Sequence, residues 1–294
     1  MRPTNTFLFA MSCVACFLAV SLLRAQTHAS TTNATKNGKT LLPGLELLEL
    51  QPDQAQSAEK SAPITILRID PASWDLFAAS TSEAGESTAH TAREWSLARK
   101  FTAAINAGMF LDDGKTHAGY FRFGDKVNAR KANSYQSVVA FDPKGSSDLP
   151  RFRIFDLDEP KTTIAAIAND YGSVAQNLRL IKKPGSNQWP EQEKKWSEAA
   201  LGEDDKGRIL FIFSRAPYSM HEFNRILLTA GIGVVAAQHL EGGPEAQLYI
   251  HAGNFEKEMF GSYETSFNQN DTNAIPWPIP NVFGIRPRAT SSSH

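Results

Sequence analysis

The stretch MHEFNRILLTAGIGVVAAQHLEGGPEAQLYI, residues 220–250, decides the fold class. Its first part carries Phe223, Ile226 and Leu227 at helical spacing, and Gly231 stands where such a helix would end. GIGVVAAQHL then has the nearly unbroken apolar character of a buried strand, and LYIHAG predicts another strand after a glycine turn. Helix and strand signals in this order predict an α+β fold: a single domain with a mixed β-sheet, flanking helices and a polar cleft formed by strand-end loops.

Other segments repeat these signals. HTAREWSLARKF, residues 90–101, predicts a helix with Thr91 as its N-cap, and it runs into the strand-like FTAAINAGMF. Further strands are expected within residues 41–51, 62–71, 74–81, 134–143, 151–158, 172–181 and 208–215.

The N-terminal segment differs from the rest. Residues 1–25 combine Arg2, an apolar run and small residues before a cleavage point, which is typical of a secretory signal peptide. An uncleaved membrane anchor and a lipobox ending at Cys16 are the alternatives. Both cysteines lie in this segment, so the mature protein would contain no thiol. We expect residues 26–40 to be a disordered leader, 41–288 the domain and 289–294 a flexible tail, in a periplasmic or secreted protein with no stable membrane span.

The composition and the absence of certain motifs argue against several classes of function. A net charge of −1 and a pI near 6.7 give no basic footprint for a nucleic-acid partner. The sequence lacks a nucleophile elbow, a P-loop and a dinucleotide fingerprint, so no cofactor is expected. The histidines show no zinc-helix spacing, so no metal is expected either.

Polar clusters follow four apolar strands. They are Asn106 to Gly108, Gln176 to Arg179, Ser214 with Arg215, and His239 to Gly243. A polar group at the end of a buried strand is held rigidly while its tip reaches a surface cleft, as a binding site requires. Each cluster also has a structural interpretation: a glycine turn capped by Glu241, an amide-stabilised turn, an ion pair or a hydrogen-bonded core residue.

Five segments, in chain order, resemble the bacterial phosphodiester glycosidase family. They are INAGMF followed by Asp113 and Gly114, then QNLRLI, AALG, LEGGPEAQLYI and IPNVFGIR, within residues 64–286. That family is related to the catalytic domain of the mammalian uncovering enzyme, which removes N-acetylglucosamine from a phosphodiester on lysosomal glycans. The resemblance implies an α+β domain with its cleft at the strand-end loops.

Matched position by position, Asn106 and Gly108 correspond to the family's Asn-x-Gly, Gln176 to its strand-end Gln, and Gly242 with Gly243 to its Gly-Gly. Glu241 stands where the family usually has Asp. Glu198 stands where it commonly has Arg, so another cation, Arg179 or Arg215, would have to meet a substrate phosphate.

The resemblance implies a secreted hydrolase that cleaves a sugar-1-phosphodiester at the anomeric carbon. Such chemistry needs a carboxylate and donors for the departing phosphate. The expected catalytic residues are Glu241, Asn106 and Glu198, and the expected substrate-binding residues are Gly108, Gln176, Asn177, Arg179, Arg215, His239, Gly242, Gly243 and Glu245. The partner would be a carbohydrate phosphodiester or an envelope glycan.

Two other functions stay open. A non-catalytic periplasmic or secreted protein could use the same fold to bind glycans, as the Arg-to-Glu departure at Glu198 suggests. A metal-dependent phosphodiesterase is less well supported, because the sequence shows no His/Asp ligand cluster.

Overall fold

The computed structural model describes residues 35–52, 62–83, 85–145 and 148–289. The predicted signal peptide and nearly all of the predicted C-terminal tail lie outside these residues. Strand β1 begins at Thr35, so residues 35–40, predicted to be disordered leader, lie in a strand instead. Their polar composition hid this strand, which is formed by pairing with β2 across the turn at Gly44, where φ is 72°.

Seventeen strands are described, and they form two sheets. The strands of the large sheet are β1 (Thr35–Leu42), β2 (Leu45–Gln51), β3 (Ile64–Ile69), β6 (Phe121–Phe123), β7 (Lys126–Ala129), β8 (Ser137–Pro143), β9 (Phe152–Asp156), β10 (Tyr171–Lys182), β11 (Ser186–Asn187), β12 (Trp196–Asp204), β13 (Ile209–Tyr218) and β14 (Val234–Gly242). Those of the small sheet are β4 (Trp74–Ser80), β5 (Ala103–Asn106), β15 (Gln247–Ala252), β16 (Phe255–Phe260) and β17 (Asn281–Pro287).

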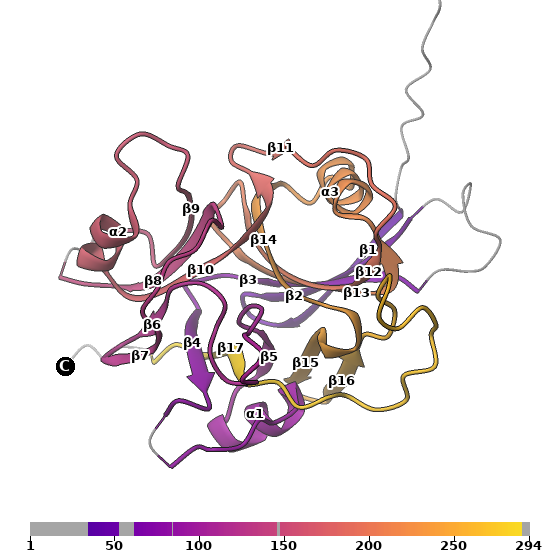
Figure 1. Ribbon diagram of the computed structural model, residues 1–294, viewed down its shortest axis with the longest axis horizontal. Coiled ribbons are helices and arrows are strands. Elements are labelled where there is room, and N and C mark those ends of the chain that lie inside the picture. Colours follow the sequence, from indigo (N-terminus) through magenta and orange to yellow (C-terminus); the bar gives the residue numbers. More distant parts are fainter. Residues whose placement is uncertain (1–34, 53–61, 84, 146–147, 290–294) are drawn as a thin grey trace, which may run out of the picture. The chain divides into compact units, whose positions relative to one another are not determined.

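The large sheet has the order β1-β2-β3-β13-β12-β14-β10-β6-β7, with β8 and β11 attached to β10 and β9 attached to β8. The small sheet has the order β16-β15-β5-β17-β4 (Figure 1). All pairings between these strands are antiparallel. The single mixed sheet predicted from the sequence is therefore wrong, because apolar patterning identifies strands but not their direction or partners.

Three α-helices within the described residues lie beside the sheets: α1 (Ala92–Arg99), α2 (Ile164–Asp170) and α3 (Met220–Thr229). The predicted N-cap Thr91 is confirmed, and it forms a capping box with Glu94. The helix predicted from residue 220 is α3, which Ser219 caps and which buries Phe223 and Leu227. Helix α2 was not predicted, since its seven residues carry little periodic signal.

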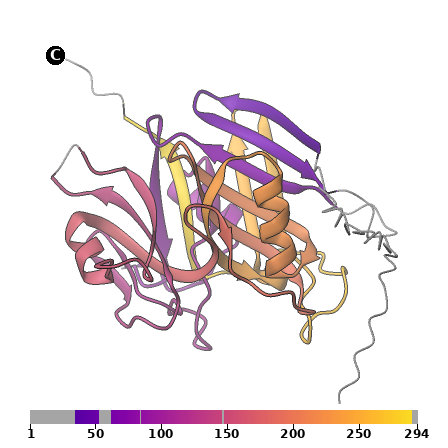
Figure 2. The ribbon, with the colours of Figure 1, turned by 90° about the horizontal axis from the view of Figure 1, so that it is seen from above.

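The main hydrophobic core lies between the two sheets. It joins Leu67 and Phe211 of the large sheet to Ile105, Leu248 and Ile285 of the small one. A second cluster fills the space between α3 and the opposite face of the large sheet, and a third lies under α1 (Figures 1 and 2). Two packed sheets with a helix on each outer face thus fix the positions of the strand ends.

Within the described ranges, we find no helix with the length and apolar character that a membrane span requires.

Candidate active site

Two central strands of the large sheet carry the candidate site. In the antiparallel pair β12–β14, Glu198 lies opposite Gly242, and Ala199 lies opposite Glu241. The next pair is Ala200 with His239, so the ladder contains an irregularity between these pairs. Such an irregularity re-aims side chains locally, and it brings polar groups of β14 toward the start of β12.

Glu198 and His239 form a buried pair. The Glu198 Oε1 atom lies 2.7 Å from His239 Nδ1, and Trp196 Nε1 donates to Glu198 Oε2 at 2.7 Å. Burial raises the pKa of Glu198, although His239 and Trp196 oppose this. Burial also acts to lower the pKa of His239, but the charge and hydrogen bond of Glu198, together with the nearby Glu241 and Glu264, raise it above its usual value. The imidazole is therefore biased toward its cationic form.

Glu241 is a second buried acid of the site. Burial raises its pKa to about 8, opposed by His239 and reinforced by Glu245. Its Oε1 atom accepts a hydrogen bond from the Gly242 amide at 3.1 Å. At pH 7 the side chain is about ten times more often neutral than ionised. A carboxyl group in this state can donate a proton or a hydrogen bond, and it does not repel an anion.

Glu264 completes the group, and the sequence did not reveal it. It lies in the segment after β16, which the Ser197 amide fixes through a hydrogen bond to Tyr263 O at 2.8 Å. A Cβ atom on Gly243 would lie 2.6 Å from Glu264 Oε2, so a side chain at this position would displace the carboxylate. Burial raises the pKa of half-buried Glu264, although His239 opposes this.

Glu245 lies in the 3₁₀ turn Gly243–Glu245 that follows β14. Burial and then the charge of Glu264 raise the pKa of its carboxyl group. Asn106 holds this turn, because its Nδ2 donates to Glu245 O at 2.9 Å and its Oδ1 accepts from Gln247 N at 2.7 Å. Asn106 therefore connects β5 to the Glu-Gly-Gly turn through both ends of its amide.

Gln176 is engaged entirely with backbone. Its Nε2 donates to Asn133 O and Tyr135 O, and its Oε1 accepts from Tyr120 N and Asn133 N. These bonds fix the segment that carries Tyr135, whose pKa is raised by burial and then by Glu241. The Gln176 amide thus holds the backbone segments beside the candidate site in place.

Asn177 and His117 converge on Gly108. Asn177 donates to Ala107 O at 3.0 Å. A Cβ atom on Gly108 would lie 2.1 Å from Asn177 Oδ1 and 2.2 Å from His117 Nε2. Burial lowers the pKa of His117 despite hydrogen bonds that oppose it, so its ring is neutral. The small size of Gly108 is what admits these two polar atoms.

The two arginines predicted as phosphate ligands have other partners. Arg179 Nη1 lies 2.7 Å from Asp156 Oδ1 and 2.6 Å from Asp158 Oδ2. Arg215 pairs with Asp271 at 2.7 Å and donates to the carbonyls of Phe260, at the end of β16, and Asn273. These contacts give the predicted phosphate role of either arginine no support.

Across the ranges that the structure covers, no three His, Cys, Asp or Glu side chains are grouped as a metal site would require.

Comparison with known proteins agrees with the motifs. The family model described as phosphodiester glycosidase matches residues 99–286. The catalytic domain of zebrafish N-acetylglucosamine-1-phosphodiester alpha-N-acetylglucosaminidase, auto-inhibited by its pro-peptide, has a similar structure, with a TM-score of 0.55 and 14% identity over 87% of this chain and 83% of that one. A hypothetical protein from Synechocystis also has a TM-score of 0.55 and 14% identity, over 86% of this chain and 64% of that one. At this identity the structures establish the fold alone. No curated protein sequence matches the chain significantly.

Proposed function

Because the chain belongs to the phosphodiester glycosidase family, we propose that it hydrolyses a sugar-1-phosphodiester at the anomeric carbon, in the periplasm or outside the cell. The observation that carries the proposal is the buried Glu241, with a pKa of about 8, among three other glutamates and a histidine. A site that separates the proton affinities of neighbouring carboxyl groups supplies both an acid and a base near neutral pH.

Glu241 acts as the proton donor in this scheme. The bond between the anomeric carbon and the phosphate oxygen breaks, and the leaving phosphomonoester accepts a hydrogen bond or the proton from Glu241. Because Glu241 is neutral at pH 7, it can lie beside the anionic phosphodiester without repelling it. Removal of such an acid typically costs a factor of 10² to 10⁴ in rate.

Glu264 acts as the base. It is less buried than Glu241 and lies beside Gly243, where an attacking water would reach it. The water transfers one proton to Glu264 and forms the new bond to the anomeric carbon, so the products are a free sugar and a phosphomonoester. Glu245 is the alternative base. It lies close enough to Glu264 for the charge of Glu264 to raise its pKa.

His239 supplies the positive charge that the family's arginine would give. Glu198 stands at the arginine position of the family pattern and binds His239 Nδ1. A protonated His239 would then present Nε2 to the substrate. In this assignment Glu198 is a positioning residue rather than the second catalytic carboxylate.

The test is incubation of the protein with N-acetylglucosamine-1-phosphodiester model substrates, with free sugar and phosphomonoester followed by mass spectrometry. Wild type should release sugar, and Glu241→Gln should lose at least about 100-fold in rate. Glu258→Gln, an exposed glutamate on β16, is the matched control and should retain full rate. Equal rates for wild type and Glu241→Gln would remove Glu241 from the mechanism.

A glycan-binding protein without turnover is the second candidate. It is favoured by the Glu198 position and by the engagement of Arg179 and Arg215 in ion pairs elsewhere. Saturable glycan binding by calorimetry, with no product from any substrate of a varied panel, would support this function instead.

A further inference from the structure

A cavity of about 710 Å³ lies far from the glutamates of the candidate active site. Ile209 lines it, and Ile209 pairs with Glu203 at the end of the β12–β13 ladder, whereas Glu198 pairs with Ser214 near the other end. Five residues along a strand separate Glu198 from Glu203, which corresponds to about 17 Å. The cavity is therefore a separate site, and its volume is within the usual range for small-molecule pockets.

Four phenylalanines contribute to the aromatic part of a cavity lining that is otherwise largely polar. Phe101, Phe123, Phe141 and Phe152 all line it, and each is otherwise buried in the protein. They come from β6, β8 and β9 of the large sheet and from the segment before β5, so the cavity opens where the main core reaches the surface. An aromatic lining of this kind favours a ligand with a planar apolar ring.

Some of the charged groups around this lining are already neutralised. Arg288 Nη1 lies 3.0 Å from Asp75 Oδ1, and Glu83 pairs with both Arg99 and Lys126. These five residues line the cavity as well. Arg99 also pairs with Glu86, so these groups leave little charge for a ligand to balance.

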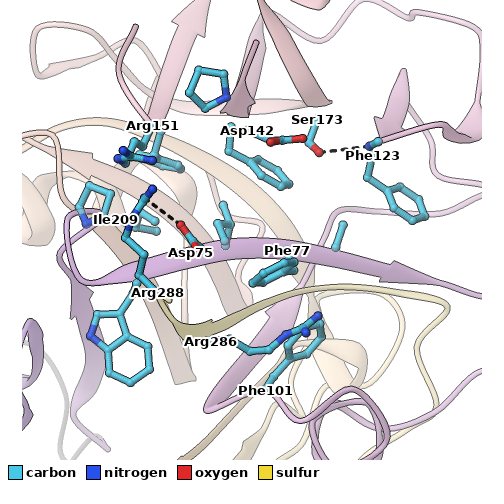
Figure 3. Close-up of a pocket in the computed structure, with 18 of the residues that line it drawn as sticks. Asp75, Phe77, Phe101, Phe123, Asp142, Arg151, Ser173, Ile209, Arg286 and Arg288 are labelled. Carbon is cyan, nitrogen blue, oxygen red and sulfur yellow. Dashed lines mark hydrogen bonds and ion pairs between the residues drawn. The ribbon is translucent and has the colours of Figure 1, made fainter. Parts of the chain in front are cut away.

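Four other charged side chains of the lining are not neutralised: Arg151, Arg286, Asp125 and Asp142. None of them forms an ion pair with any described residue. Figure 3 shows Arg151 and Asp142 on one wall, with Arg286, Phe77 and Phe101 on the other. The Arg286 guanidinium is held 4.0 Å from the Phe77 ring centroid, so it is fixed without being neutralised.

Arg151 and Asp142 adjoin one pair of aromatic residues. In the β8–β9 ladder Phe141 lies opposite Phe152, and Asp142 and Arg151 are the next residues outward on each side. Asp142 has a left-handed backbone with φ of 61°, and a Cβ atom on Gly172 would lie 2.2 Å from its Oδ2. The chain therefore keeps an unusual conformation that aims this carboxylate across Gly172.

We propose that this cavity binds an organic zwitterion with an aromatic ring, of which a free aromatic amino acid is the simplest case. The ring contacts the phenylalanine lining, the ligand carboxylate binds Arg151 and the ligand ammonium binds Asp142. A ligand with both charges satisfies Arg151 and Asp142 together, whereas a simple anion would pair only with Arg151 and a simple cation only with Asp142. The proposal is independent of the reaction at Glu241.

Calorimetry on the full chain with four probes tests this. L-Phenylalanine carries the ring and both charges, 3-phenylpropionate lacks the ammonium, 2-phenylethylamine lacks the carboxylate, and glycine lacks the ring. L-Phenylalanine should bind at least about tenfold more tightly than each of the others. Absence of phenylalanine binding, or equal affinity for phenylalanine and 3-phenylpropionate or 2-phenylethylamine, would overturn the proposal.

Substitutions then locate the site. Arg151→Gln should reduce the phenylalanine affinity to that of 2-phenylethylamine, and Asp142→Asn should reduce it to that of 3-phenylpropionate. Arg130→Gln is the matched control, because Arg130 is exposed and does not line the cavity. Glu241→Gln should bind phenylalanine as wild type does. A dissociation constant unchanged in both Arg151→Gln and Asp142→Asn would overturn the assignment even if phenylalanine binds.

Discussion

Glu198 Oε1 lies 2.7 Å from His239 Nδ1, and only 3% and 5% of the two side-chain surfaces are exposed. A carboxylate and an imidazole at this distance are hydrogen-bonded, and because they are removed from water, loss of either partner would leave the other uncompensated. The pair joins neighbouring strands, since Glu198 belongs to β12 and His239 to β14. It also links the Arg-to-Glu departure from the family pattern at Glu198 to a cation that the substrate could use.

The first prediction concerns the proton affinity of His239. Glu198→Gln removes the charge that acts most strongly against the effect of burial, so the pKa of His239 should fall below its wild-type value. Titration of the histidine ring signals by NMR measures this directly. The same variant should lose about 3 kcal/mol of stability, because a buried partner is left without its counter-charge.

Glu49→Gln is the control for that loss. Glu49 pairs with Lys257 at 2.9 Å, but both side chains are about one-third exposed, and such a pair contributes about 1 kcal/mol or less. Equal losses of stability in the two variants would show that burial of the Glu198–His239 pair does not increase its contribution to stability.

The second prediction is a pH dependence of stability caused by Glu241. Its pKa is about 8 in the folded protein against 4.5 for a glutamate exposed to water. Between these values the unfolded chain has released the proton and the folded chain retains it, so stability falls as pH rises through this window. At pH 7 the cost is about 3 kcal/mol. Glu241→Gln removes this cost. When the pH is raised from 4.5 to 7, the variant should therefore gain about 3 kcal/mol of stability relative to wild type.

Urea denaturation of both proteins at the two pH values measures the difference. Glu258→Gln, with an exposed side chain, should follow the wild-type profile. Parallel profiles for wild type and Glu241→Gln would mean that Glu241 keeps an ordinary proton affinity in the folded protein.

The sequence predicted α1 and α3 well because their signals are local. Each helix carries its own capping residue and apolar side within about ten residues. Most long strands were also predicted, since apolar runs mark them. Strand direction was not, because pairing between β12 and β14 joins segments about 40 residues apart, and no local pattern encodes it.

Only those residues of the candidate site that belong to the family motifs could be predicted from the sequence. The roles of Asn106 and Gln176 as backbone supports depend on contacts with distant segments that their own motifs do not contain. Glu264 lies in a polar loop with no motif, and contacts that join this loop to Gly243 and to β12 bring it to the site. For Arg179, the sequence could not reveal that Asp156 and Asp158 engage its guanidinium.

The third prediction concerns the space beside Gly108. Gly108→Ala would place a Cβ atom 2.1 Å from Asn177 Oδ1 and 2.2 Å from His117 Nε2, at a backbone φ of 149°. Both polar groups are buried, so neither can move into water, and we expect a loss of at least about 3 kcal/mol. Chemical denaturation measures it. Gly114→Ala is the control: its φ is 66° but no atom lies within 4 Å, so backbone strain alone should cost about 1 to 2 kcal/mol. A loss no larger than this in Gly108→Ala would show that the two polar groups can move aside.

The fourth prediction separates strain from catalysis at Gly243. Gly243 and Gly253 both have φ of 62°, but only at Gly243 does an added Cβ meet another group, 2.6 Å from Glu264 Oε2. Alanine at either position should therefore cost about 1 to 2 kcal/mol in unfolding free energy. Only Gly243→Ala should displace the Glu264 carboxylate, so it alone should lower the rate of sugar release. We expect a loss of at least about tenfold, since a displacement of about 1 Å in a reacting group can cost as much as 10²-fold in rate. Denaturation and turnover assays on the same two preparations give both numbers. Equal rates in the two variants would exclude Glu264 from the reaction, whatever their stabilities.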